Sequence, residues 1–233
     1  MTDRKVALVT GGARGIGRAI AYDLARDHRV VAVRNTSPGE GLPEEIHLMT
    51  ADLAAVGSCK EVVAEVIDRF GRLDVIVNNA AVMAETPREG FKGEDWRRIF
   101  DVNVMVPADL LSTALPHLKP GAAIVNVSSV NAALPPRGAV AYGASKAALE
   151  LWTKGMAKEL GAKGIRVNAV APGAINIPEA PRSKELTDLF VAETALGRIG
   201  VPEDIARAVR FLAGDAAGFI TGEVLTVSGG YRL

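Results

Sequence analysis

Short apolar runs alternate with amphipathic segments along almost the whole chain, and this alternation constrains the fold more than any other feature. The first run, Val6–Thr10, ends in glycines, and residues 16–25 then place apolar side chains at helical spacing. Further strands are expected at 29–33, 46–49, 75–77, 123–127, 165–170 and 224–227, and further helices at 58–70, 94–118, 141–160 and 202–212. Alternation of this kind predicts an α/β fold: a doubly wound parallel sheet of about seven strands with helices on both faces.

The size and charge of the chain limit the classes of protein it can belong to. Its 233 residues suit one domain spanning 1–233, without repeats or linkers. Acidic and basic side chains balance at 27 each, which argues against a nucleic-acid-binding face but leaves room for a small phosphate pocket. Cys59 is the only cysteine, and we see no signal-peptide core and no apolar run long enough to span a bilayer. We expect a cytoplasmic protein without a membrane partner.

Local signals mark several helix ends and one loop. Ser58 is available as an N-cap, Gly71 follows the end of the same helix, and Pro202 suits a first helical turn. Residues 35–45, which contain Pro38, Gly39, Gly41 and Pro43, are too short and too broken for a full crossover helix. We predict a loop there.

The turn between the first strand and the first helix is rich in glycine. It reads Thr10-Gly11-Gly12-Ala13-Arg14-Gly15-Ile16-Gly17. Glycines allow a tight turn and let a phosphate approach the backbone N–H groups at a helix N-terminus. A bare tight turn would have the same composition, but the position between a buried strand and a helix favours a phosphate site.

This turn resembles the cofactor turn of the short-chain dehydrogenases/reductases, including members like the 3-oxoacyl-carrier-protein reductases. Four further segments match that family in order: Asn78-Asn79-Ala80-Ala81, Ser128-Ser129, Tyr142-x-x-x-Lys146 and Pro172-Gly173. The C-terminal stretch 197–230 also looks like the family's usual ending, so the resemblance covers essentially the whole chain. It implies one Rossmann-type domain that interconverts a carbonyl and a secondary alcohol with a nicotinamide cofactor.

The resemblance and the residue chemistry together predict four catalytic residues. Tyr142 and Lys146 lie one helical turn apart, and an ammonium group beside a phenol stabilises the phenolate, so Lys146 is expected to lower the pKa of Tyr142. By resemblance, Tyr142 exchanges the proton, Ser129 orients the substrate oxygen, and Lys146 also holds the nicotinamide ribose. Asn103 matches a fourth family position, whose backbone carbonyl holds a water molecule.

Pro107 adds a hypothesis about that carbonyl. Proline has no N–H group, so it cannot bond to the carbonyl four residues earlier, which belongs to Asn103. Pro107 could keep this carbonyl free for the water, or it could be an ordinary helix kink.

The end of the second strand favours NADP(H) over NAD(H). An acidic residue there would bind the ribose hydroxyls and repel a 2′-phosphate, but the chain has Arg34-Asn35 and no acidic residue before Glu40. Arg14 in the glycine turn can reach the same place, and two guanidinium groups suit a phosphate. They could also be solvated surface arginines, and NAD(H) stays possible.

The resemblance implies further cofactor contacts and shows two departures. The expected set from the glycine turn is Gly11, Gly12, Arg14, Gly15, Ile16 and Gly17, and beyond the turn it is Arg34, Asn35, Asp52, Leu53, Asn79, Tyr142, Lys146, Pro172 and Ile175. Ala81 stands where the family usually has glycine, and Ile177 stands where it often has a threonine that hydrogen-bonds the cofactor. Ile177 cannot make that hydrogen bond. No metal site is predicted.

The substrate and the assembly are less constrained. Residues 176–196 are expected to form a short substrate lid over a small-molecule carbonyl or alcohol, which Arg137 or Arg182 would contact if it were acidic. By resemblance we expect a homotetramer or homodimer, with residues 152, 156 and 160 in an interface or in the core. Two alternatives remain: an NADP(H)-binding sensor or scaffold without turnover, and an NAD(H)-dependent alcohol dehydrogenase.

Overall fold

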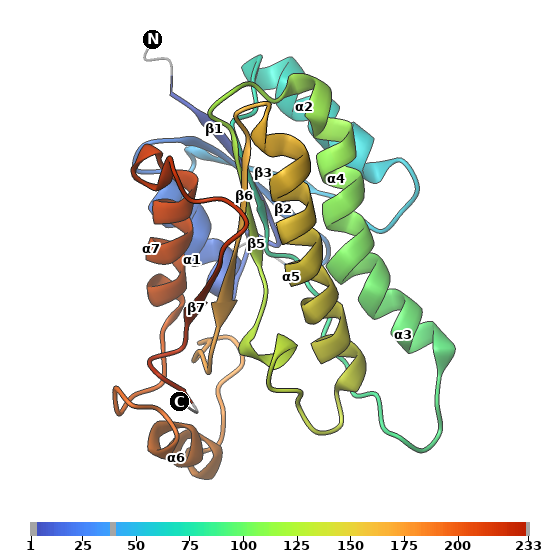
Figure 1. Ribbon diagram of the computed structural model, residues 1–233, viewed down its shortest axis with the longest axis vertical. Coiled ribbons are helices and arrows are strands. Elements are labelled where there is room, and N and C mark those ends of the chain that lie inside the picture. The colour runs from blue at the N-terminus through green and yellow to red at the C-terminus, as the bar shows by residue number, and fades with distance from the viewer. Residues whose placement is uncertain (1–3, 38–40, 232–233) are drawn as a thin grey trace.

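The computed structural model describes residues 4–37 and 41–231 and has the predicted α/β architecture. In this part of the chain, seven strands form one sheet in the order β3-β2-β1-β4-β5-β6-β7, and every neighbouring pair is parallel (Figure 1). The strands are β1 (Val6–Thr10), β2 (Arg29–Arg34), β3 (Ile46–Thr50), β4 (Val75–Asn78), β5 (Ala123–Val127), β6 (Arg166–Pro172) and β7 (Val224–Val227). The strand order switches direction between β1 and β4, where doubly wound sheets bind ligands at their carboxyl ends.

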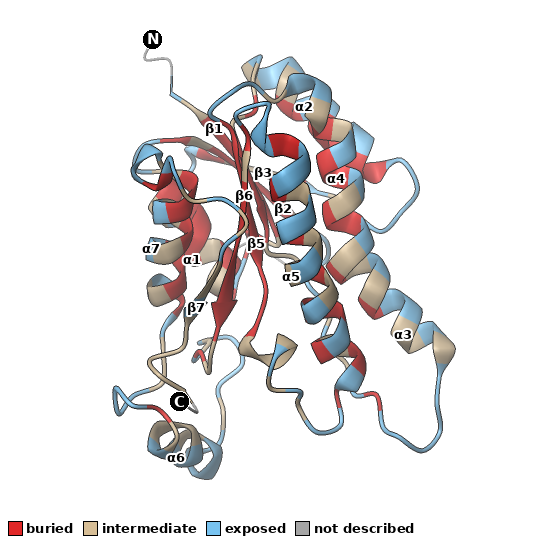
Figure 2. Cartoon of the chain, in the orientation of Figure 1, coloured by how far each residue is buried: buried red, intermediate tan, exposed pale blue. Residues whose placement is uncertain are grey.

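Helices cover both faces of the sheet. One face carries α1 and α7, and the other carries α2, α4 and α5 (Figure 1). The bounds are α1 (Gly15–Leu24), α2 (Ser58–Phe70), α3 (Gly93–Phe100), α4 (Val106–Ala114), α5 (Val140–Gly161), α6 (Lys184–Ala192) and α7 (Pro202–Ala213). The sheet is buried between two apolar clusters, one under each helical layer (Figure 2). Strands covered on both faces explain why the sequence shows continuous apolar runs instead of alternation.

The two ends of α2 show where local signals succeed and fail. Gly71 lies just past the helix at φ 71°, and its N–H donates to the carbonyl of Ile67, as expected of a C-terminal glycine. The Ser58 N-cap prediction was wrong, because Gly57 at φ 84° takes that position and Ser58 is the first helical residue. A left-handed backbone there favours glycine.

The single helix predicted over 94–118 is interrupted. A π-helical turn, Asp101–Met105, separates α3 from α4, and the N–H of Val106 donates to the carbonyl of Asp101. Pro107 follows directly in the first turn of α4. The wider turn accommodates the missing proline N–H without breaking the run.

This helical run also corrects an expectation about membranes. Gly93–His117 is long and apolar enough to pass for a membrane-spanning helix, although we expected no such run. Its residues Val106, Leu110 and Leu111 lie in the apolar cluster between the sheet and α2. A core helix can have the same composition, and these residues place α4 in the core.

The 35–45 segment, the expected lid and α5 can each be compared with the sequence predictions. The described parts of the 35–45 segment, 35–37 and 41–45, contain no helix or strand, while Pro38, Gly39 and Glu40 lie outside the described residues. The expected lid, 176–196, contains a helix that the sequence did not suggest, α6. On α5, Leu160 is buried and Trp152 and Met156 pack against the same core.

Candidate active site

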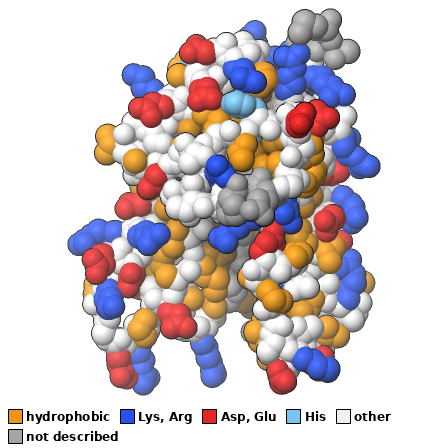
Figure 3. Space-filling model, turned by 180° about the vertical axis from the view of Figure 1, so that it is seen from behind, with side chains coloured by type: hydrophobic (Ala, Val, Ile, Leu, Met, Phe, Trp, Pro, Cys, Tyr) orange, Lys and Arg blue, Asp and Glu red, His pale blue; other side chains and the backbone are white. Residues whose placement is uncertain are grey.

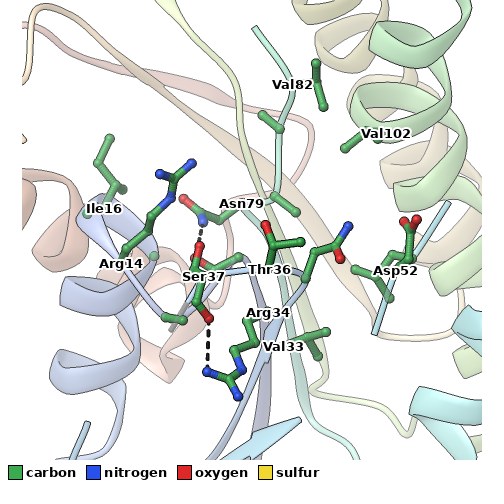
Figure 4. A pocket seen from close by; sticks show the side chains of 18 of the residues that line it. Arg14, Ile16, Val33, Arg34, Thr36, Ser37, Asp52, Asn79, Val82 and Val102 are labelled. Atoms are coloured by element: carbon green, nitrogen blue, oxygen red, sulfur yellow. Dashed lines mark hydrogen bonds between the residues drawn. The ribbon is translucent and has the colours of Figure 1, made fainter. Parts of the chain in front are cut away.

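A cavity of ≈ 660 Å³ opens at the carboxyl ends of β1, β2, β3 and β4 (Figure 4). Many of the predicted cofactor residues line it: Gly11, Arg14, Gly15, Ile16, Gly17, Arg34, Asn35, Asp52, Leu53 and Asn79. The lining also includes residues that the sequence did not single out, among them Ser37, Val82, Arg98, Val102, Glu179 and Ala180. Its volume falls within the usual range for small-molecule sites.

The glycine turn forms one wall of the cavity and tolerates no larger side chains. Gly11 and Gly15 have φ of 64° and 50°. A Cβ atom on Gly17 would lie 2.1 Å from the carbonyl oxygen of Gly11 and 2.4 Å from Nδ2 of Asn79. Gly12 does not line the cavity: its N–H donates to the Val33 carbonyl at 3.1 Å, and a Cβ on it would meet β2. The turn therefore fits a phosphate through backbone groups.

Asn79 holds this turn against the end of β4. Its Nδ2 donates to the carbonyls of Thr10 and Gly11 at 3.0 and 3.1 Å. The Thr10 hydroxyl accepts from the N–H groups of Asn79 and Ala80, each at 3.0 Å. Asn79, predicted as a cofactor contact, thus shapes the site as well as lining it.

The side chains of the two predicted arginines, Arg14 and Arg34, differ in direction and in how they are held. Arg34 donates through Nε to the Thr50 hydroxyl at 2.9 Å and through Nη1 to the Ser37 carbonyl at 3.0 Å. In Figure 4 its side chain extends toward Ser37, and the exposed side chain of Arg14 extends the opposite way. Both guanidinium groups border the cavity, but Arg34 is held at the rim by its own loop and by β3.

The predicted catalytic residues gather beside the ends of β5 and the start of α5. The Ser129 hydroxyl accepts from the N–H of Asn131 at 3.1 Å and also hydrogen-bonds the phenol of Tyr142. Lys146 lies over the ring of Tyr142, with Nζ 5.7 Å from the ring centroid. Its Nζ donates to the carbonyl of Val127, the last residue of β5, at 2.8 Å.

Asn103 ties this cluster to the cavity. Its buried side chain accepts from the N–H of Val82 at 2.8 Å and donates to the Val82 carbonyl at 2.9 Å. Its Nδ2 also donates to the Ser145 hydroxyl, which donates to the carbonyl of Tyr142 at 2.7 Å. A chain of hydrogen bonds therefore runs from Val82 on the cavity wall to Tyr142. Both polar atoms of the Asn103 side chain therefore have partners, while the predicted water concerns its backbone carbonyl.

Comparison with known proteins accords with this geometry. Residues 11–232 match the family described as enoyl-(acyl carrier protein) reductase. A 3-oxoacyl-[acyl-carrier-protein] reductase of Thermotoga maritima is 35% identical, over 97% of each chain. A solved short-chain dehydrogenase/reductase from Serratia marcescens is 36% identical, with a TM-score of 0.93 over 98% of each chain. The chain belongs to the short-chain dehydrogenase/reductase family. A further structure, a blue fluorescent protein from a metagenomic library in complex with NADPH, is 33% identical, with a TM-score of 0.91 over 98% of each chain.

The pKa of Tyr142 departs from the sequence prediction. Burial raises the pKa of the phenol above its ordinary value, and the hydrogen bond with Ser129 opposes this only in part. Ser129 is the group that lowers the pKa, and Lys146, whose ammonium group donates to the Val127 carbonyl, does not contribute the lowering that the sequence predicted. In this member of the short-chain dehydrogenase/reductase family, Tyr142 is therefore a neutral phenol at neutral pH.

The ammonium group of Lys146 is itself destabilised. Burial lowers the pKa of Lys146 to about 8, and the negative charge of Glu150 one turn further along α5 opposes the shift. The Ser128 hydroxyl donates to Glu150 at 2.7 Å and holds that carboxylate in place. This gives Ser128 a structural role. At neutral pH Lys146 keeps its proton, but a rise of about one pH unit would begin to remove it.

The segment after β6 differs from the family pattern in the way the sequence indicated. Pro172 ends β6, and Ile175 is buried, with its carbonyl accepting from Nη1 of Arg182. Neither residue borders the cavity. Ile177 does, and its Cγ2 lies 3.1 Å from the position of a Cβ on Gly15, so it places an apolar group where the family often has threonine. Arg182 also stacks on Phe190, 5.4 Å from the ring centroid, so it braces the lid and is not free for an acidic substrate.

Proposed function

We propose that this chain is an NADP(H)-dependent oxidoreductase that interconverts a carbonyl and a secondary alcohol, with Tyr142 as the general acid and base. One observation carries the proposal: a half-buried, neutral phenol shares a hydrogen bond with the Ser129 hydroxyl at the carboxyl edge of the sheet, beside a cavity with a glycine-rich turn suited to a phosphate. We propose the whole chain, 1–233, as one catalytic domain with 176–196 as its substrate lid.

The chain's own residues divide the work of the reaction. A bound nicotinamide would supply or accept the hydride. Tyr142 gives a proton to the substrate oxygen in the direction of reduction, for which a neutral phenol is the required form. Ser129 would donate a hydrogen bond to the same oxygen, Lys146 would hold a ribose hydroxyl, and the backbone carbonyl of Asn103 would hold the water predicted there.

Charge at the rim supports NADP(H) as the cofactor. The described residues from Val33 to Ser37 include no carboxylate, while Arg14 and Arg34 both border the cavity. On the face shown in Figure 3, acidic and basic side chains are interspersed, so attraction of a 2′-phosphate depends on these local arginines and not on a broad basic field. The relative solved with NADPH supports the same choice.

Replacing Arg14 with alanine tests this cofactor assignment. We expect the Kd for NADPH to rise about tenfold and the Kd for NADH to change little, because a charge-assisted hydrogen bond to the 2′-phosphate is lost. Fluorescence titration of both reduced cofactors measures the effect, and Arg26→Ala, on the exposed end of the α1 region, is the control. Preference of the unaltered protein for NADH, or equal loss for both cofactors, would overturn the assignment.

The substrate is proposed at the level of its reacting group. The relative named as a 3-oxoacyl-[acyl-carrier-protein] reductase makes 3-oxoacyl thioesters the first compounds to assay, followed by diketones, cyclic ketones and aldehydes. We propose a cytoplasmic homotetramer or homodimer as the working assembly, following the family. The assay follows the loss of reduced-nicotinamide absorbance when NADPH is mixed with each carbonyl compound. Oxidation of NADPH with any of them supports the function, and cofactor binding without turnover would favour a sensor.

A further inference from the structure

Glu179 occupies the N-terminus of α1, although no sequence motif marks it. Its Oε1 accepts from the N–H of Gly15 at 3.3 Å and lies 2.8 Å from Nη2 of Arg18. Burial alone would raise the pKa of Glu179, but backbone N–H groups and the charges of Arg18 and Arg14 hold it below its usual value. The carboxylate is therefore ionised at neutral pH and acts as an anion bound at the phosphate turn.

The surrounding segment holds this carboxylate in position. The N–H of Ala180 donates to the Ile177 carbonyl at 2.9 Å, which closes a tight turn with Glu179 near its tip. Ile177 packs over Gly15, and Arg182 anchors the following residues through the Ile175 carbonyl. The two hydrogen bonds shape the segment, the Ile177 contact holds it against the start of α1, and Glu179 lines the cavity with it.

A dinucleotide phosphate and this carboxylate need the same donor. Anions bind helix N-termini through the free N–H groups of the first turn, and α1 has no side-chain cap of its own. Two anions cannot share the Gly15 N–H, and like charges at this distance repel. Binding of the phosphate therefore requires that Glu179 moves away.

We propose that Glu179 is a determinant of cofactor affinity: its carboxylate takes the place of one dinucleotide phosphate at the α1 N-terminus and competes with it. The inference rests on the proposed function, because it assumes that a dinucleotide phosphate binds this turn. The energy needed to displace Glu179 lowers the affinity and keeps the lid segment on the turn until cofactor arrives.

The test compares Glu179→Gln with a matched variant, Glu185→Gln, which removes the same charge from the first turn of α6 in the same segment. NADPH is titrated by fluorescence and inorganic pyrophosphate by calorimetry, with thermal unfolding as a check on the fold. Glu179→Gln is expected to bind NADPH and pyrophosphate about tenfold more tightly than the unaltered protein. This is the size of effect expected when the competing carboxylate loses its charge-assisted hydrogen bond and its ion pair. Glu185→Gln is expected to bind both like the unaltered protein.

Failure of this inference is distinguishable from failure of the proposed function. If Glu179→Gln binds NADPH and pyrophosphate no more tightly than the unaltered protein, or more weakly, the competition is refuted. If no protein binds NADPH, the proposed function fails, and the pyrophosphate titration still decides whether Glu179 competes for the turn. An equal gain in affinity in Glu185→Gln would also refute the competition, because removing any negative charge from the segment would then have the same effect.

Discussion

Replacing Tyr142 with phenylalanine is expected to lower kcat for carbonyl reduction by about 10³-fold, within the usual contribution of general acid catalysis. The ring and its burial are kept, and only the proton donor and its hydrogen bond with Ser129 are lost. The Kd for NADPH should change by no more than about threefold, because the phenol contributes one hydrogen bond at most. Stopped-flow absorbance gives the rate, and fluorescence titration gives the affinity.

Tyr22 provides the matched control for this variant. It is a partly exposed tyrosine on α1, and its hydroxyl donates to the Gly41 carbonyl outside the proposed catalytic cluster. Tyr22→Phe should leave kcat unchanged within about twofold. If Tyr142→Phe kept more than about a tenth of the activity, general acid catalysis by this phenol would be wrong.

Replacing Gly17 with alanine is expected to destabilise the protein by about 3 kcal/mol and to abolish cofactor binding, because overpacking against the backbone cannot relax easily. The added methyl group would lie 2.1 Å from the Gly11 carbonyl oxygen and would push on Asn79. The glycine turn would have to open, and with it the N–H groups offered to a phosphate. Urea unfolding measures the first effect and NADPH titration the second.

Gly155 is the contrasting position. It lies in the interior of α5 with nothing within 4 Å of an added Cβ atom. Gly155→Ala should raise the free energy of unfolding by about 0.5–1 kcal/mol through helix propensity alone. Equal stability of Gly17→Ala and the unaltered protein would contradict the close packing of the turn.

The sheet could be predicted from the sequence because its strands are buried on both faces. β1 and β5 consist entirely of buried residues, so each appears in the sequence as an apolar run with sharp ends. α6 was missed although Leu186, Leu189 and Phe190 lie at helical spacing; none of its residues is buried, so the helix is not part of the core. One signal was present: the hydroxyl of Ser183 accepts from the N–H of Leu186 as an N-cap.

The site was only partly accessible from sequence. Tyr142, Ser129, Lys146 and Asn103 were named from ordered motifs. In the fold, hydrogen bonds connect Tyr142 with Ser129 and, through Ser145, with Asn103, while Lys146 lies over the Tyr142 ring. The pKa of Tyr142 depends on burial and on the direction of the Lys146 amino group, which spacing along a helix does not reveal. Glu179 is 164 residues from Gly15, and only tertiary structure brings the two together.

The most direct test of the central claim follows the hydride itself. The unaltered protein is incubated with NADPH carrying deuterium on one face of the nicotinamide C4, together with a carbonyl compound that it reduces, and the product is analysed by mass spectrometry and NMR. If the cavity and Tyr142 act as proposed, one of the two C4 labels delivers deuterium to the carbinol carbon. Consumption of NADPH with either label without deuterium on that carbon would contradict direct hydride transfer at this site.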